Sequence, residues 1–128
     1  MSCLIDNKYN LEIWQGATFS MTVTVNDANA NVQNLTGYSA RMQIRTSYAA
    51  ASATESLTTS NGEITITAAE GNVSLELAAS RTANISVDYN NGKPPKSVYV
   101  YDLELIDNAG KVSKLLYGDL NVYGEVTR

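Results

Sequence analysis

The sequence contains no histidine, and this absence excludes several kinds of active site at once. Without histidine the chain cannot build a Ser-His-Asp triad, a Cys-His pair or a histidine-ligated metal site. Cys3 is the only cysteine, so no internal disulfide can form and a zinc site is not expected. We interpret Cys3 as a small apolar residue rather than a reactive thiol. We therefore expect neither a metal nor another cofactor.

Charge is also scarce, and it is mostly negative. Charged residues make up 17% of the chain, and 9 Lys and Arg against 13 Asp and Glu give a net charge of −4. No basic cluster of the kind that binds nucleic acid is present. No run approaches the ~18 apolar residues of a membrane span, and the first residues lack the features of a signal peptide. We expect no nucleic-acid partner and no membrane association.

The pattern that is present is alternation with a period of two residues, which is typical of half-buried strands. In the segment 18–25, Phe19, Met21, Val23 and Val25 share one face, while Ser and Thr take the other. The segment 38–46 repeats the pattern, with Ala40, Met42 and Ile44 inward. Ser and Thr alternating with branched residues suit strands better than helices. The chain of 128 residues, 44% apolar, is large enough for one domain with one core.

About seven strands are expected in total. They fall in the segments 9–16, 18–25, 38–46, 62–68, 72–78, 98–106 and 111–123. The segment 47–56 reads as a loop or one helical turn, Ser80 as the N-cap of a short helix, and Pro94-Pro95 as an extended segment. This pattern predicts an all-β antiparallel sandwich at residues 11–128, with at most one short helix, after an N-terminal arm at residues 1–10. A small β-barrel is the alternative.

The last two strands carry acids that need an explanation. Asp102 and Glu104 share one face of their strand, with Cβ atoms roughly 7 Å apart, a spacing compatible with a glycosidase pair. Their surroundings favour a solvated strand face, because Lys111 and Lys114 of the return strand can pair with them. On the opposite face, Tyr99, Tyr101, Leu103 and Leu105 are expected to enter the core. No catalytic residue is predicted.

Two further acids lie where the chain turns or is interrupted. Asp107-Asn108-Ala109-Gly110 is typical of a hairpin loop in which Gly110 adopts the left-handed conformation. Gly118-Asp119 indicates a bulge. No calcium loop, phosphate-binding glycine motif or nucleophile elbow occurs in the sequence.

The aromatic residues are the main candidates for contacts. Tyr and Trp are enriched at protein interfaces, and several lie at expected loops or strand ends. The candidates chosen from this group are Trp14, Tyr48, Tyr89 and Tyr123. Each can serve a protein–protein contact, a glycan contact or ordinary packing.

Four segments, "IWQGATFSMTVTV", "NLTGYSARMQIR", "GEITI" and "VYVYDLELIDNAGKVSKLLYGDLNVYGEVTR", resemble short proteins encoded by tailed bacteriophages. Those proteins resemble the immunoglobulin-like domain of phage baseplate upper proteins and of the collar that anchors L-shaped tail fibres. The most specific pieces are Gln15–Phe19, Leu35–Tyr38 and Glu125–Arg128. The resemblance implies an immunoglobulin-like β-sandwich without catalytic residues. "YNNGKPPKS" departs from the short turn usual there, which adds Lys93, Pro94 and Pro95 to the candidate interface.

The expected function is that of a non-enzymatic structural protein of the virion, assembled in the bacterial host cytoplasm. It would be a tail, neck or collar component present in symmetric copies, connecting fibres to the particle. Its partners would be other virion proteins and copies of itself. The alternatives are a head decoration (cement) protein on the capsid and a carbohydrate-binding module. The carbohydrate-binding alternative predicts a coplanar aromatic platform.

Overall fold

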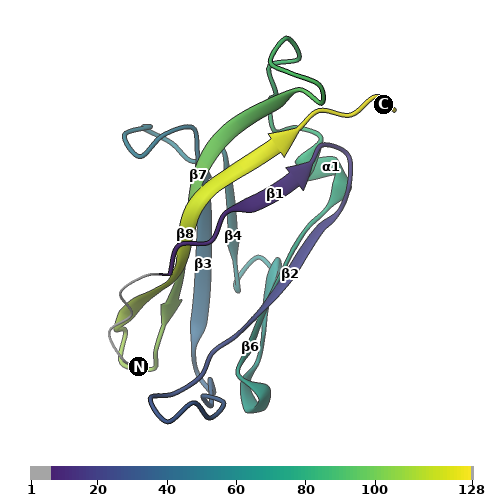
Figure 1. The fold of residues 1–128 in the computed structure, drawn as a ribbon. Helices are drawn as coiled ribbons and strands as arrows, with labels where there is room; N and C mark the ends of the chain where they lie inside the picture. The colour runs from purple at the N-terminus through teal and green to yellow at the C-terminus, as the bar shows by residue number, and fades with distance from the viewer. Residues whose placement is uncertain (1–6, 128) are drawn as a thin grey trace.

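The structure, a computed structural model, describes residues 7–127 and consists of two β-sheets (Figure 1). The larger sheet has five strands in the order β1-β8-β7-β3-β4, and the smaller has three in the order β2-β6-β5. The strands of the larger sheet are β1 (Leu11–Trp14), β3 (Ser39–Arg45), β4 (Glu55–Thr58), β7 (Lys96–Ile106) and β8 (Val112–Tyr123). Those of the smaller sheet are β2 (Phe19–Thr24), β5 (Ile64–Thr67) and β6 (Asn72–Leu77).

Helix is limited to two short elements among the described residues. A 3-10 turn, η1 (Ala68–Glu70), precedes β6, and a four-residue helix, α1 (Ala79–Thr82), follows it. The predictions of a mostly-β, two-sheet architecture and of at most one short α-helix are confirmed. Residues 7–127 include no helix that is long and apolar enough to cross a membrane.

Two details of the predicted architecture are wrong. The structure has eight strands instead of seven, because β4 begins inside the segment interpreted as a loop or helical turn. Leu57 of β4 pairs with Met42 of β3, and each is 1% exposed, so β4 helps to close the core. In addition, β1 pairs with β8 in parallel, whereas an antiparallel sandwich was expected.

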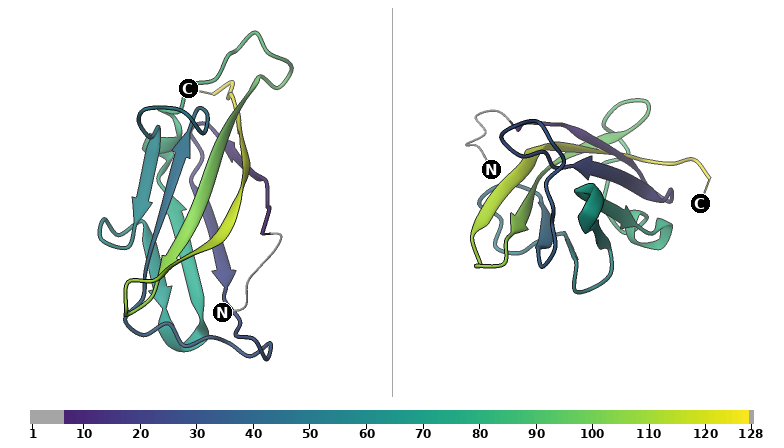
Figure 2. Two further views of the ribbon diagram at one scale, coloured as in Figure 1. Left: turned by 90° about the vertical axis from the view of Figure 1, so that its left-hand side faces the viewer. Right: turned by 90° about the horizontal axis from the view of Figure 1, so that it is seen from below.

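The core lies between the two sheets and follows the predicted alternation. The two layers are seen edge-on in Figure 2. In β3, Ala40, Met42 and Ile44 are buried while Arg41 and Gln43 are exposed. The largest fully buried side chains are Ile13, Leu35, Met42, Ile44, Leu57, Ile64, Leu75, Leu77, Ile85, Leu103, Leu120 and Val73. Burial of this apolar surface is the main stabilising contribution to the fold.

The β7–β8 hairpin has the predicted faces and the predicted turn. Tyr99, Tyr101, Leu103 and Leu105 are all buried. At the turn, Asp107 Oδ1 accepts hydrogen bonds from the backbone amides of Ala109 and Lys111, both at 2.9 Å. Gly110 has φ +86°, the left-handed conformation that glycine adopts without steric cost.

The irregularity in β8 lies elsewhere than predicted. Leu103 pairs with Leu116 and Glu104 with Lys114, so the extra residue is Leu115 rather than Gly118 or Asp119. Gly118 has a different role. A Cβ atom there would lie 2.8 Å from both Tyr9 O and Asn10 Oδ1, so the missing side chain lets the preceding segment run against β8.

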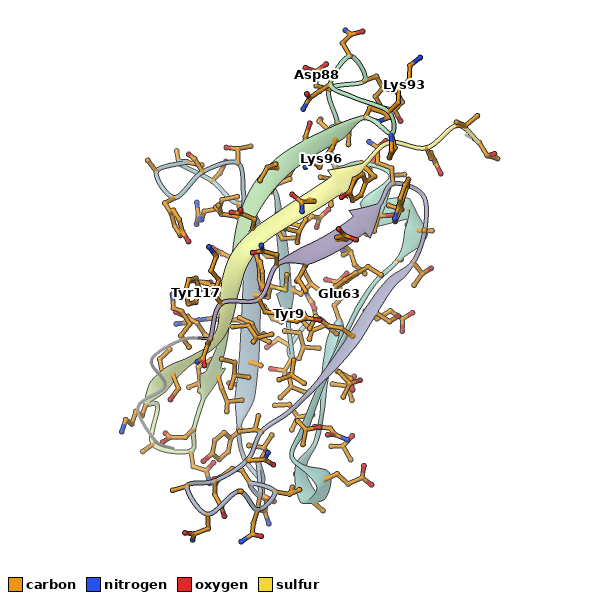
Figure 3. All side chains as sticks on the ribbon, viewed as in Figure 1. Tyr9, Glu63, Asp88, Lys93, Lys96 and Tyr117 are labelled. Carbon is orange, nitrogen blue, oxygen red and sulfur yellow. The ribbon has the colours of Figure 1, made fainter. Side chains whose placement is uncertain are left out.

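That segment, residues 7–10, extends the parallel pairing of β1. The Tyr9 amide donates to Tyr117 O at 2.8 Å, and the Tyr117 amide donates to Asn7 O at 3.2 Å. The buried hydroxyl of Tyr101 donates to Tyr9 O at 2.5 Å. Figure 3 labels Tyr9 and Tyr117 side by side in this region. Cys3, in the predicted N-terminal arm, lies outside the described residues.

Helix α1 begins differently from the prediction. Its N-cap is Ala78, without a side-chain cap, so the assignment of Ser80 as N-cap is wrong. The buried residue Thr82 holds the helix in place instead. Its hydroxyl donates to Ala17 O at 2.9 Å and accepts from the Gly16 amide at 3.1 Å. The helix is thereby fixed to the turn between β1 and β2.

Candidate interaction surface

Trp14 and Tyr123 form an aromatic stack on the outer face of the larger sheet. They are register partners at the ends of β1 and β8, with ring centroids 4.7 Å apart and ring planes 23° from parallel. The Tyr123 hydroxyl donates to Glu12 Oε2 at 3.2 Å. Desolvation and the Glu12 carboxylate raise the pKa of Tyr123. The rings lie one over the other, so they do not form the side-by-side platform that the carbohydrate-binding alternative predicts.

Tyr89 and Pro95 pack against the chain where β8 ends. A Cβ atom on Gly124 would lie 2.9 Å from Pro95 Cγ and 3.0 Å from Tyr89 Cζ, so only glycine fits beneath them. The Tyr89 hydroxyl donates to Gln15 Oε1, and buried Gln15 in turn donates to Ile85 O at 2.6 Å. Tyr89, although 41% exposed, is therefore fixed by the fold.

Lys93 and Pro94 lie at the tip of the same loop and are exposed. Figure 3 shows Lys93 at the end of the molecule, in the loop that precedes β7. The loop is closed by a backbone hydrogen bond from Lys96 N to Asn91 O at 3.0 Å. Pro94 and Pro95 lie in a turn, so the predicted extended segment is wrong. Glycine at position 92 (φ +94°) and this closure bend the chain back instead.

Tyr48 is separate from these residues. It is 75% exposed and lies in the loop between β3 and β4. Arg45 Nη1 donates to Ala50 O at 2.9 Å and so holds this loop against the sheet. Tyr48, Gln43, Val100 and Asp102 are among the residues that line a surface depression of about 180 Å³. Six of the seven candidate residues thus gather at one end of the sandwich, and Tyr48 borders the depression.

The paired acids of the hairpin form surface ion pairs. Lys114 Nζ lies 2.8 Å from Asp102 Oδ2, as predicted. Arg41 of β3, rather than Lys111, pairs with Glu104, at 2.8 Å. The hydrogen bond that Lys114 donates to Asp102 is the main cause that raises the pKa of Lys114. Each pair is partly exposed, and such pairs contribute roughly 0–1 kcal/mol. Residues 7–127 contain no group of three or more acidic or thiol side chains placed to bind a metal ion.

A second charged cluster, which no pattern in the sequence predicted, is centred on Arg81 of α1. Its Nη2 lies 2.5 Å from Glu55 Oε1 and its Nη1 lies 2.5 Å from Glu63 Oε2. The hydrogen bond with Glu55 is the largest cause that raises the pKa of Arg81. These carboxylates are only 12% and 16% exposed, and Glu63 Oε1 is buried without a hydrogen-bond partner. The cluster ties α1 to β4 and to the start of β5, so we interpret it as structural.

A shallow groove of about 370 Å³ lies between the free edges of the two sheets. Residues 9–12 form its wall on the β1 side, and Phe19, Ser20 and Met21 form its wall on the β2 side. Phe19 and Met21 are half-buried and pack against the core. The groove was not predicted, because its walls come from strands of different sheets.

No family model matches the chain, and no curated protein matches it.

Proposed function

We propose that the chain is a non-enzymatic structural protein of a bacteriophage virion, built on an immunoglobulin-like sandwich. In this proposal it is a tail, neck or collar component, present in symmetric copies, that connects fibres to the particle. The observation that carries the proposal is the strand order, taken together with the sequence segments that resemble phage proteins of this kind.

The strand order supports an immunoglobulin-like assignment. Variable-type immunoglobulin domains place strands B, E and D in one sheet and G, F, C and C′ in the other. The sheet β2-β6-β5 corresponds to B-E-D, and the strands β8-β7-β3-β4 correspond to G-F-C-C′. The short helix α1 lies in the connection between β6 and β7, which joins E to F in this correspondence.

A tyrosine near the start of β7 adds to this support. Immunoglobulin-like domains place a tyrosine near the start of strand F, and its hydroxyl bonds to backbone upstream in the E–F corner. Here Tyr99 donates its hydroxyl to Ser86 O at 2.6 Å. Ser86 lies in the connection between β6 and β7, as that motif requires. Burial raises the pKa of Tyr99, so the hydroxyl remains a donor to a higher pH than that of an exposed tyrosine.

The segments that carry the phage resemblance have definite positions in the fold. Gln15–Phe19 forms the turn between β1 and β2, where Gln15 makes its buried hydrogen bonds. Leu35–Tyr38 leads into β3, and Leu35 is 1% exposed. These residues support the sandwich, and they leave its outer surfaces for contacts between proteins. A structural role requires such free surfaces.

The experiment that tests the proposal is localisation on the particle. An antibody raised against the chain is used for immunogold electron microscopy of purified virions from cultures that produce it, with mass spectrometry of the same particles. Label at the tail, neck or collar supports the proposal. Label over the head supports the decoration alternative. The absence of the chain from virions rejects both.

A further inference from the structure

We propose that the outer face of the larger sheet, around Val98, binds the same face of a second copy of this chain. The inference rests on the proposed function, which requires repeated copies, and it names the surface through which two copies meet. Three observations support it: exposed apolar side chains, the charge of the face and a neighbouring depression.

The first observation is a patch of large side chains on this face. We call Trp14, Tyr48, Val98, Val100 and Tyr123 the outer patch. Val98 is 50% exposed, Trp14 47% and Tyr48 75%. Exposed apolar side chains that lie together, especially aromatic ones, are typical of protein interfaces.

The sheet register makes the outer patch continuous. Val98 and Val100 are two residues apart on β7, so they point to the same side. Val98 pairs with Asn121, and Tyr123 is therefore its diagonal neighbour on β8, roughly 7–8 Å away between Cα atoms. Tyr123 stacks on Trp14 of β1. The patch thus crosses three strands.

The second observation is the charge of this face. Eight ionisable side chains point outward from the five strands: Glu12, Asp102, Glu104, Asp119, Arg41, Arg45, Lys96 and Lys114. Four are acidic and four are basic, so the face is formally neutral, and the net charge of −4 lies on the rest of the chain. Two copies that meet through this face therefore bring no net like charge together. A two-fold contact also allows bases of one copy to meet acids of the other.

The third observation is the depression of about 180 Å³ beside Val100. Tyr48 forms part of its rim, and Arg45 holds the loop that carries Tyr48. A side chain from the opposing copy has a place to enter there. In an isologous contact each copy offers both the depression and the projecting side chains, so a single patch is sufficient.

The test is the oligomeric state of the whole chain in solution. Sedimentation velocity and equilibrium are measured up to about 1 mM protein, a range that detects weak association. We expect a dimer that forms with increasing concentration. Val98→Lys places two like charges in the contact and should raise the dimer dissociation constant by at least about tenfold.

The matched control is Val32→Lys. Val32 is 48% exposed, close to the value for Val98, but lies in the connection between β2 and β3, away from the outer patch. This variant should dimerise like the unchanged chain. Circular dichroism and thermal melting check that both variants fold.

Three results would overturn the inference: a monomer at every concentration, a Val98→Lys variant that dimerises normally, or equal weakening by Val32→Lys. These results are separate from the localisation experiment. A monomeric chain that is nevertheless found on virions rejects this face alone, whereas a dimer absent from virions rejects the proposed function.

Discussion

The outer faces of the two sheets differ sharply, although the same alternation produces both. The face of the larger sheet carries Trp14, Val98 and eight charged side chains. The face of the smaller sheet is made mostly of hydroxyl groups. Its outward residues include Ser20, Thr22, Thr24, Thr65, Thr67 and Ser74. Thr22 Oγ1 and Ser74 Oγ lie 3.1 Å apart, and Thr24 Oγ1 donates to Asn72 Oδ1 at 2.8 Å, so these side chains bond to one another across the strands.

This difference shows that the fold constrains the residues on the inner faces of the sheets but not those on the outer faces. The inner faces of both sheets must fill one core, so both present Leu, Ile and Val. The outer faces have no such constraint, and short hydroxyl side chains are sufficient for a sheet face that is exposed to solvent. The large apolar side chains on only one outer face are therefore the ones on which the proposed contact between two copies rests.

The largest expected effect applies equally to both sheets. Leu103→Ala in the larger sheet and Leu75→Ala in the smaller should each lower the free energy of unfolding by about 2–5 kcal/mol, because each leaves a cavity in a shared core. The two residues are 1% and 2% exposed. Urea denaturation measures both. A much smaller loss of unfolding free energy for one variant would mean that its sheet contributes less to the packing of the core.

A smaller effect is expected where the two sheets are tied together. Arg81→Ala leaves Glu55 and Glu63 close to each other without their cation, and should cost about 1–3 kcal/mol. Thermal melting gives the measurement, and Ser80→Ala, on the exposed side of α1, is the control.

Tyr101→Phe should cost about 1 kcal/mol by removing the hydrogen bond to Tyr9 O. Burial, the largest cause, raises the pKa of Tyr101 above its ordinary value of 10.0. The folded chain keeps the hydroxyl neutral where the unfolded chain ionises it. This contribution is therefore complete below about pH 10 and is lost as the pH rises further. Tyr101→Phe should show a smaller alkaline loss of stability, measured by denaturation between pH 8 and 11. An unchanged alkaline loss would contradict the assignment.

The smallest effects are expected on the outer faces. Asp102→Asn with Glu104→Gln should change the free energy of unfolding by less than about 1 kcal/mol, because both ion pairs are partly exposed. Thr22→Ala with Ser74→Ala, on the other face, should change it by about 0.5 kcal/mol or less. Denaturation curves compare the two double variants. A loss of clearly more than about 1 kcal/mol in the Asp102, Glu104 variant would mean that these surface ion pairs do contribute to the stability of the fold.

The sequence predicted the fold where local patterns determine it. Alternation correctly placed Met42 inside and Arg41 outside, and the turn residues correctly located Asp107 and Gly110. The pattern failed for β4, whose sequence Glu-Ser-Leu-Thr has a single large apolar residue. The pairing with β3, which no local pattern encodes, makes it a strand.

The candidate surface was predicted only in part, for the same reason. The aromatic residues chosen as interface candidates are exposed or partly exposed, because they lie at loops and strand ends. Their arrangement depends on which strands pair. Trp14 meets Tyr123 only because β1 runs parallel to β8. Arg81 meets carboxylates that are 26 and 18 residues away along the chain. Neither the separation of Trp14 from Tyr123 nor that of Arg81 from its carboxylates corresponds to a sequence motif that predicts the contact.

The pairing of β1 with β8 also determines when the larger sheet can form during synthesis of the chain. Leu11 is synthesised long before its partner Leu120, because more than a hundred residues separate them in the sequence. Until β8 has left the ribosome, both β1 and β7 lack the strand that lies between them. Contacts this distant in sequence close slowly. An unfinished chain therefore exposes open strand edges, and copies cannot assemble through a completed larger sheet before translation reaches Tyr123.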